Sequence, residues 1–149
     1  MKRAFSHLDS GGAARMVDVG SKSVVSRSAV AAAVLKCASG TIRLLKAGAL
    51  KKGDVLAVAR IAGIQAVKRT AELIPLCHTV PVTHAAVHFS VKASSIEIRC
   101  EVRGEAKTGF EMEALTGASV AALTLYDMMK SADKTMVIDG LTLLSKAKG

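Results

Sequence analysis

The chain of 149 residues is long enough for one domain with its own core, and half of its residues are apolar, which excludes a disordered or disulfide-stapled protein. Three cysteines at unrelated spacings and the lack of a leader pattern favour a reducing, cytoplasmic setting, and no apolar run approaches the roughly 20 residues of a membrane helix. The net charge of +9 resides in residues 1–75, which carry 13 basic and 4 acidic side chains, while residues 76–149 carry 8 of each. A nucleic acid or a small polyanionic substrate would suit this charge, although three Phe and one Tyr offer few rings for base stacking.

The first half of the chain predicts an arm and two helices. Residues 1–15 show little apolar periodicity, which indicates a flexible N-terminal arm, and residues 16–19 follow as a short predicted strand. The alanine-rich stretch over residues 26–45 predicts a first helix with a serine at its start. A second helix is predicted over residues 55–73, with Asp54 as its cap.

A change of periodicity after Pro81 predicts a β-hairpin. Apolar and polar residues alternate over residues 84–91 and again over residues 96–101, and Ser94-Ser95 is suited to the turn between them. The alternation indicates an antiparallel pair with one face exposed to water.

The last part of the chain predicts a long helix and a final strand. Thr108 and Glu111 have the spacing of a capping box, so a third helix is expected from there to about Lys130. Residues 136–144 resemble a strand that Asp139-Gly140 interrupts by a bulge or a turn. We therefore expect residues 16–149 to form one α+β domain, with helices packed on one face of a mostly antiparallel sheet.

Cys77, His78, His84 and His88 are all possible zinc ligands within twelve residues. However, His84 and His88 fall in a predicted strand, where four residues span about 13 Å, so their rings share a face and cannot share an ion. We therefore expect no metal site, and we interpret these side chains as polar residues of a wet sheet face or a loop.

Asp127 and Lys130 lie three residues apart on the predicted third helix, so their side chains meet on one face. The spacing fits a functional pair and equally an ordinary surface ion pair. Glu111 and Glu113 fall in the first turn of the same helix, where carboxylates are favoured by the helix dipole alone.

Seven segments in this order resemble the molybdenum cofactor biosynthesis protein C family, the cyclic pyranopterin monophosphate synthases: MVDV at 16–19, KGD at 52–54, RIAGI at 60–64, KRT at 68–70, IPLCH at 74–78, TGFEMEAL at 108–115 and TLYDMMK at 124–130. The resemblance implies a ferredoxin-like fold and a homohexamer assembled as a trimer of dimers. It implies a lyase that converts a cyclised dihydroguanosine triphosphate into cyclic pyranopterin monophosphate, releases pyrophosphate and needs no redox cofactor. A nucleic-acid-binding module and an inactive scaffold with this fold are the alternatives.

The resemblance also implies which residues form the site. Lys52 and Lys130 would be the essential lysines, and Asp127 the catalytic acid or base, with a lysine pKa lowered by neighbouring cations. The substrate would be contacted by Leu76, Cys77, His78, Glu111, Met112 and Glu113, and its phosphates by Arg27, Lys68 and Arg69.

A site at a dimer interface is a further expectation from the family. If Lys52 and Lys130 came from different chains, Lys52→Ala and Lys130→Ala proteins refolded together would regain part of the parental activity.

Overall fold

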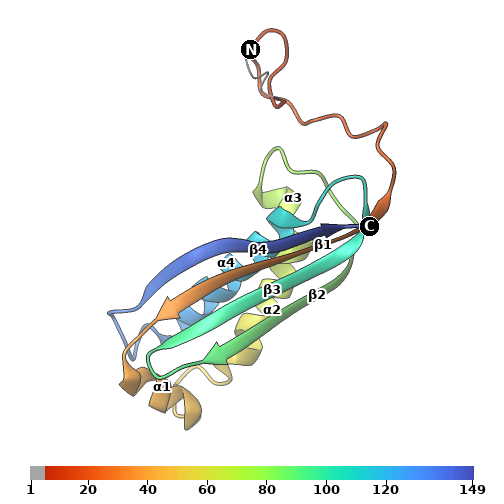
Figure 1. The fold of residues 1–149 in the computed structure, drawn as a ribbon. Coiled ribbons are helices and arrows are strands. Elements are labelled where there is room, and N and C mark those ends of the chain that lie inside the picture. The colour runs from red at the N-terminus through yellow and green to blue at the C-terminus, as the bar shows by residue number, and fades with distance from the viewer. Residues whose placement is uncertain (1–5) are drawn as a thin grey trace.

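The computed structural model describes residues 6–149, in which helices cover one face of a four-stranded sheet (Figure 1). In chain order the elements are β1 (Val25–Lys36), α1 (Ser39–Lys46), α2 (Val55–Lys68), α3 (Thr70–Leu73), β2 (Val82–Val91), β3 (Ser95–Ala106), α4 (Glu111–Met129) and β4 (Val137–Lys148). None of the helices in this part of the chain is long and apolar enough to cross a membrane.

The sheet has the strand order β2-β3-β1-β4, and each pair of neighbours is antiparallel. Two β-α-β units therefore interlock, so that β1 and β3 occupy the centre and α2 and α4 lie side by side on one face. This arrangement confirms the expected α+β, ferredoxin-like fold. The hairpin of β2 and β3 and the bulge near Asp139-Gly140, where the register with β1 shifts, are also confirmed.

The alanine-rich segment that predicted a helix over residues 26–45 is instead mostly the central strand β1. Every second side chain of β1 points to the helical side of the sheet. These side chains are 0–1% exposed: Ala29, Ala31, Ala33 and Leu35. β1 pairs with β3 on one side and β4 on the other, so pairing and burial outweigh the helix propensity of alanine. Only the end of the segment forms a helix, α1.

The small side chains of β1 face equally small ones on α4, where Ala114, Ala118 and Ala121 are fully buried. At the crossing of α2 and α4, Gly63 and Gly117 bring the two backbones together, because a Cβ on Gly63 would lie 3.0 Å from the Gly117 carbonyl oxygen. The two helices are therefore held close together over the sheet.

Several smaller predictions are tested by the structure. Asp54 caps α2 as expected, because its carboxylate accepts a hydrogen bond from the Ala57 N–H at 3.0 Å. The predicted strand over residues 16–19 is wrong, since these residues pair with no strand in the described part of the chain. The capping box is also wrong, because α4 begins after Phe110 with no side-chain cap.

The N-terminal arm lies partly outside the described residues, because residues 1–5 are not described. Residues 6–15 form a turn in which Leu8 and Ala14 form a β-bridge and the Asp9 carboxylate accepts hydrogen bonds from the Gly11 and Ala13 N–H groups. Arg60 of α2 reaches the edge strand β2, where its Nε donates to the Val87 carbonyl at 3.1 Å.

Candidate functional site

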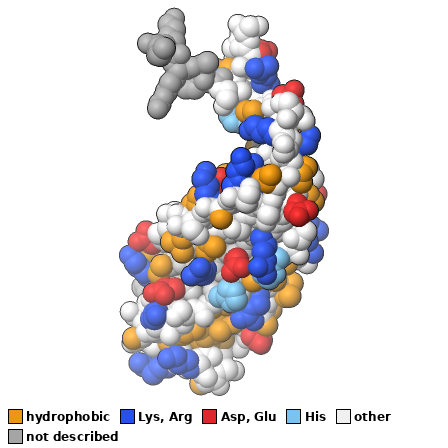
Figure 2. All heavy atoms as spheres, turned by 45° about the vertical axis from the view of Figure 1, so that its right-hand side comes forward, with side chains coloured by type: hydrophobic (Ala, Val, Ile, Leu, Met, Phe, Trp, Pro, Cys, Tyr) orange, Lys and Arg blue, Asp and Glu red, His pale blue; other side chains and the backbone are white. Residues whose placement is uncertain are grey.

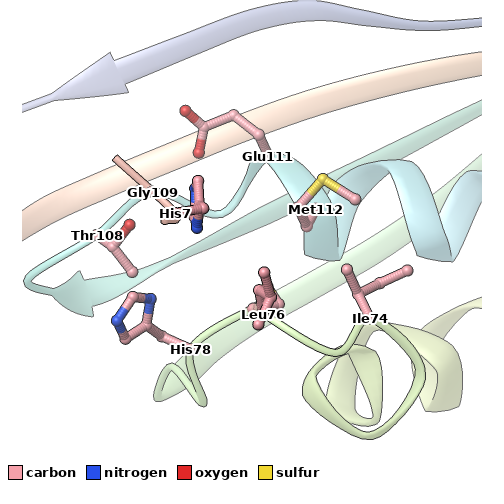
Figure 3. A pocket seen from close by; sticks show the side chains of 9 residues that line it. His7, Ile74, Leu76, His78, Thr108, Gly109, Glu111 and Met112 are labelled. Carbon is pink, nitrogen blue, oxygen red and sulfur yellow. The ribbon is translucent and has the colours of Figure 1, made fainter. Parts of the chain in front are cut away.

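A cavity of about 360 Å³ opens where α4 begins. The loop after α3 forms one wall and the residues that lead into α4 form the other (Figure 3). The lining residues are His7, Ile74, Leu76, Cys77, His78, Thr108, Gly109, Glu111 and Met112. The structure therefore brings together two predicted segments, IPLCH and TGFEMEAL, that lie about thirty residues apart.

Glu113 lies beneath this cavity in the first turn of α4 and is 3% exposed. Its burial raises the pKa of the carboxyl above the ordinary value, so the group holds a proton more readily than a surface glutamate. The Cys77 thiol lies 3.9 Å from Glu113 Oε1, and burial followed by the charge of Glu113 raises the pKa of that thiol. The pair is suited to hydrogen bonding with a polar ring, and Cys77 is poorly suited to act as a thiolate nucleophile.

His78 is fixed by the N-terminal segment. Its Nε2 lies 2.6 Å from the Val17 carbonyl, which can only accept, so Nε2 carries a hydrogen and donates it to this carbonyl. This contact explains why the MVDV segment belongs with the cavity although it forms no strand. Ile74, Thr108 and Gly109 also line the cavity and were not predicted as site residues, although they belong to the matched segments IPLCH and TGFEMEAL, which could have indicated them. His7 lies outside the matched segments, and no sequence signal indicated it.

Two basic residues lie beside the cavity entrance. Lys146 of β4 contacts Glu111 at 3.0 Å, and Arg27 of β1 donates to the carbonyls of Ala106 and Lys107. Although burial raises the pKa of Glu111, the hydrogen bond and charge of Lys146 and the charge of Arg27 leave that pKa below its ordinary value. Glu111 is therefore ionised at neutral pH, whereas burial shifts the pKa of Glu113 in the opposite direction.

A second cluster, which we call the lysine cluster, consists of Lys52, Asp127 and Lys130. Lys52 Nζ donates to the Asp127 carboxylate at 3.1 Å and to its main-chain carbonyl at 3.0 Å, and Lys130 Nζ contacts the other carboxylate oxygen at 2.7 Å. The hydrogen bond from Lys130, then that from Lys52, lowers the pKa of Asp127. All three side chains are more than 40% exposed, so the cluster is accessible from solvent.

The structure corrects two expectations about these lysines. The Asp127 carboxylate raises the pKa of Lys130, so the expected lowering by neighbouring cations is wrong for this residue. Both lysines also contact the same carboxylate within one chain, which contradicts the expectation that they come from different chains.

The cavity and the lysine cluster lie at opposite ends of α4. Glu113 and Asp127 are fourteen residues apart on this helix, which at 1.5 Å per residue corresponds to about 21 Å. The structure thus divides the predicted site residues into two groups and does not bring these groups together within one chain.

The remaining predicted residues are further from both groups. Lys68 ends α2 and Arg69 follows it, both exposed, and neither lines the cavity, although α3 and Ile74 connect them to it. His84 lies 3.9 Å from Glu101 on the neighbouring strand, away from the cavity. Within residues 6–149, no three His, Cys, Asp or Glu side chains are close enough to hold a metal ion.

A family model described as the MoaC family matches residues 16–149, which is nearly the whole chain. The chain belongs to the MoaC family. The resemblance carried by the seven sequence segments is thereby confirmed, and four of these segments supply most of the MoaC site residues described above: KGD and TLYDMMK the lysine cluster, and IPLCH and TGFEMEAL the cavity.

Individual relatives support the assignment to the MoaC family. The chain is 54% identical over 147 residues to a cyclic pyranopterin monophosphate synthase of Chloroflexus aggregans, with 97% of this chain and 89% of the relative covered. It is 51% identical over 145 residues to cyclic pyranopterin monophosphate synthase 2 of Mycobacterium tuberculosis, covering 97% and 87%. It is 48% identical over 151 residues to a synthase of the same name from Clostridium perfringens, covering 100% and 96%.

Proposed function

We propose that this protein is a cyclic pyranopterin monophosphate synthase of molybdenum cofactor biosynthesis. It converts 3',8-cyclo-7,8-dihydroguanosine 5'-triphosphate to cyclic pyranopterin monophosphate and releases pyrophosphate, without a redox cofactor. The observation that carries this proposal is about 50% identity, over nearly the full chain, to relatives of that name. The presence of Lys52, Asp127 and Lys130 in one contact cluster supports an active enzyme over an inactive scaffold.

The cavity at the start of α4 is suited to the ring system of the substrate. Leu76 and Met112 offer apolar contacts, and the polar groups around them can pair with ring N–H and amino donors. A carboxylate such as Glu111 accepts these donors, while Glu113, with its raised pKa, can accept or donate. Arg27, Lys68 and Arg69 are proposed to attract the phosphates as the substrate approaches.

The lysine cluster is suited to proton transfer and to stabilising charge. Asp127 is ionised and holds two ammonium groups, so it can accept a proton when a lysine moves to the substrate. Lys130 is fully protonated at neutral pH because its pKa is raised, and it can donate a proton or stabilise the leaving pyrophosphate. Ring opening and closure need such proton transfers.

A complete site needs two chains. Catalytic groups must come within hydrogen-bond reach of the atoms on which they act, and about 21 Å separates Glu113 from Asp127 along α4. We therefore place the cavity of one chain beside the lysine cluster of a second chain.

The outward face of α4 supports this arrangement. An apolar stripe of Met112, Val120 and Leu123 lies on this face between the cavity and the lysine cluster, and Met112 and Leu123 are 37% and 59% exposed. Two such stripes packed antiparallel about a twofold axis would be buried, and each chain's Asp127 would face the other chain's Met112. A dimer with this symmetry contains two equivalent sites.

The proposed assembly is a homohexamer, as a trimer of such dimers. A second contact surface is needed for it, and the uncovered face of the sheet offers a hollow of about 370 Å³ that includes Val34, His88, Arg99 and Leu144. Cys37, Cys77 and Cys100 are all unpaired thiols, which supports a reducing, cytoplasmic place of action. Nucleic-acid binding is not favoured, because basic and acidic side chains are interspersed on the face shown in Figure 2.

The proposed function is tested by incubating the purified protein with the cyclised triphosphate and measuring pyrophosphate and the pyranopterin product. Lys52→Ala and Lys130→Ala should each abolish turnover and keep the fold, since both side chains are exposed and leave no core cavity. Asp127→Asn should still bind the substrate and lose the chemical step in single-turnover measurements. A folded parent protein that forms no product would contradict the proposal.

A further inference from the structure

Asp133 lies in the connection between α4 and β4 and is 7% exposed. Its carboxylate accepts four hydrogen bonds. Oδ2 accepts from the Ala38 N–H at 2.7 Å and from the Thr41 hydroxyl at 3.0 Å, and Oδ1 accepts from the N–H and hydroxyl of Thr135 at 2.8 and 2.6 Å. These bonds hold the pKa of Asp133 at about 2, so the group is charged at any pH at which the enzyme would work.

The bonds of Oδ2 join two distant parts of the chain. Ala38 is the N-cap residue of α1, and Asp133, 95 residues away, accepts a hydrogen bond from its N–H, as the N3 carboxylate of a capping box normally does. The bonds of Oδ1 differ, because Thr135 belongs to the same connection as Asp133 itself. One carboxylate therefore has one oxygen turned to α1 and one to its own loop.

Each of these parts carries one lysine of the lysine cluster. Lys130 stands three residues before Asp133, and the backbone between them is closed by the Asp133 N–H donating to the Met129 carbonyl. Met129 is fully buried, so this end of α4 is fixed in the core. α1 leads directly into the loop over residues 47–54 that places Lys52 against Asp127.

We propose that Asp133 is a positioning residue that holds the Lys52 and Lys130 segments in register around Asp127. It contacts no substrate and acts through the start of α1. The proposal rests on the proposed function only for the claim that the lysine cluster works in catalysis. The arrangement of that cluster can be measured without substrate.

The chain offers a matched pair of variants for the test. Thr41→Val removes the hydroxyl that joins Asp133 to α1, and Thr135→Val removes a hydroxyl within the loop, with the same small change of shape. Asp133→Asn is the stronger perturbation, because an amide must turn a donor toward one of the N–H or hydroxyl groups that now donate to the carboxylate. Folding of each variant is checked by circular dichroism before any comparison.

The first measurement is the titration of the Asp127 carboxyl by ¹³C NMR in the full protein without ligand. In the parent, Lys130 and Lys52 keep the pKa of Asp127 low. We expect Asp133→Asn and Thr41→Val to raise this pKa toward the ordinary value, because Lys52 is no longer held in place, and Thr135→Val to leave it unchanged. An unchanged Asp127 titration in folded Thr41→Val would overturn the proposal, as would equal shifts in both threonine variants.

The second measurement separates catalysis from binding. Because displacing a catalytic group by about 1 Å costs up to about 10²-fold in rate, kcat should fall roughly tenfold or more in Asp133→Asn. KM should stay close to the parental value, since Asp133 is buried in the connection after α4 and does not line the cavity. A folded variant whose KM rises while kcat is unchanged would also overturn the proposal. If the parent has no synthase activity, the proposed function fails and the Asp127 titration still decides the role of Asp133.

Discussion

The division of the site between the two ends of α4 predicts which inactive variants can restore one another. Lys130→Ala removes part of the lysine cluster, and Glu113→Gln alters the buried carboxyl beneath the cavity without changing its size. If the cavity of one chain works with the lysine cluster of its partner, a mixed dimer has one site with both defects and one site with none. The two variants should therefore complement each other.

The expected magnitude follows from the symmetry. Random pairing of equal amounts makes half of the dimers mixed, and each mixed dimer has one intact site of two, so about one quarter of the parental activity should return. The Lys52→Ala and Lys130→Ala mixture is the matched control. Because both lysines contact the same Asp127 within one chain, every site of that mixture keeps one defect, and it should stay inactive.

The assay unfolds the two variants together in denaturant, refolds them, and measures pyrophosphate release per intact protein. Each variant refolded alone gives the baseline, and mass spectrometry of differently labelled chains verifies that mixed oligomers have formed. Activity in the Lys52→Ala and Lys130→Ala mixture would show that the two lysines act from different chains. Verified mixed oligomers of Lys130→Ala and Glu113→Gln without activity would refute the shared site.

Four further predictions concern assembly, packing and titration. Leu123→Glu should separate the dimer and abolish turnover, because it places a charge at the most exposed position of the apolar stripe of α4, and light scattering after gel filtration measures the mass. Gly117→Ala should lower the free energy of unfolding, measured in urea, by roughly 2 kcal/mol. The new Cβ would lie 2.5 Å from Cys100 Sγ, and this overpacking outweighs the gain of about 1 kcal/mol in helix propensity. The Cys77 thiol should react slowly with iodoacetamide at pH 8, because burial and then Glu113 raise its pKa, and Glu113→Gln should speed the reaction. The carboxyl of Asp133 has a pKa of about 2, below its unfolded value of about 3.9. The charged carboxylate therefore stabilises the fold fully above about pH 4, and this contribution is lost as the pH falls toward 2. Urea titrations should show that Asp133→Asn lowers the free energy of unfolding more at pH 7 than at pH 2.5.

Matched variants control two of these experiments. Leu44 of α1 is 40% exposed and lies outside the stripe, so Leu44→Glu should keep the parental mass. Gly40→Ala in α1 would meet its nearest neighbour, Arg43, at 3.5 Å and should not destabilise the protein. Equal masses for the Leu123 and Leu44 variants would contradict the proposed dimer, and equal stabilities for the two alanine variants would contradict the overpacking at Gly117. Slower alkylation in Glu113→Gln would contradict the effect of Glu113 on Cys77. A loss of stability in Asp133→Asn that does not change with pH would contradict the low pKa of Asp133.

Local sequence patterns predicted an element correctly where the local preference of the segment matched its packing in the fold. The hairpin of β2 and β3 and the helix α2 have the expected periods, and Asp54 caps α2 as its chemistry predicts. β1 was mistaken for a helix because its alanines favour helices in isolation. In the structure these alanines lie in a central strand that pairs with β3 and β4 and packs under α4. The partners are far away in the chain, so a local stretch of sequence does not indicate this position.

The candidate site could be predicted by residue and not by arrangement. Segment resemblance indicated Glu113, Asp127 and both lysines, but spacing alone could not show that Lys52 reaches Asp127 across 75 residues of chain. The separation of Glu113 from Asp127 could have been predicted, because both fell on one expected helix and their residue numbers already correspond to about 21 Å. Asp133 was missed because its partners lie far from it in the sequence or in an irregular loop, and the strand-to-helix connection that contains Ala38 was predicted to be part of a helix.

The contact of Arg60 with β2 has a consequence for how the protein behaves at high concentration. An outer strand of a sheet carries free N–H and C=O groups that can recruit a strand of another molecule and start aggregation. On β2 the guanidinium of Arg60 donates a hydrogen bond to the Val87 carbonyl and lies 5.5 Å from the centre of the Phe89 ring, so it covers part of that strand. On the opposite margin β4 is interrupted by two register shifts against β1. The Arg60 contact on one margin and the register shifts on the other make each edge a poorer template, which disfavours growth of unassembled chains through their sheets.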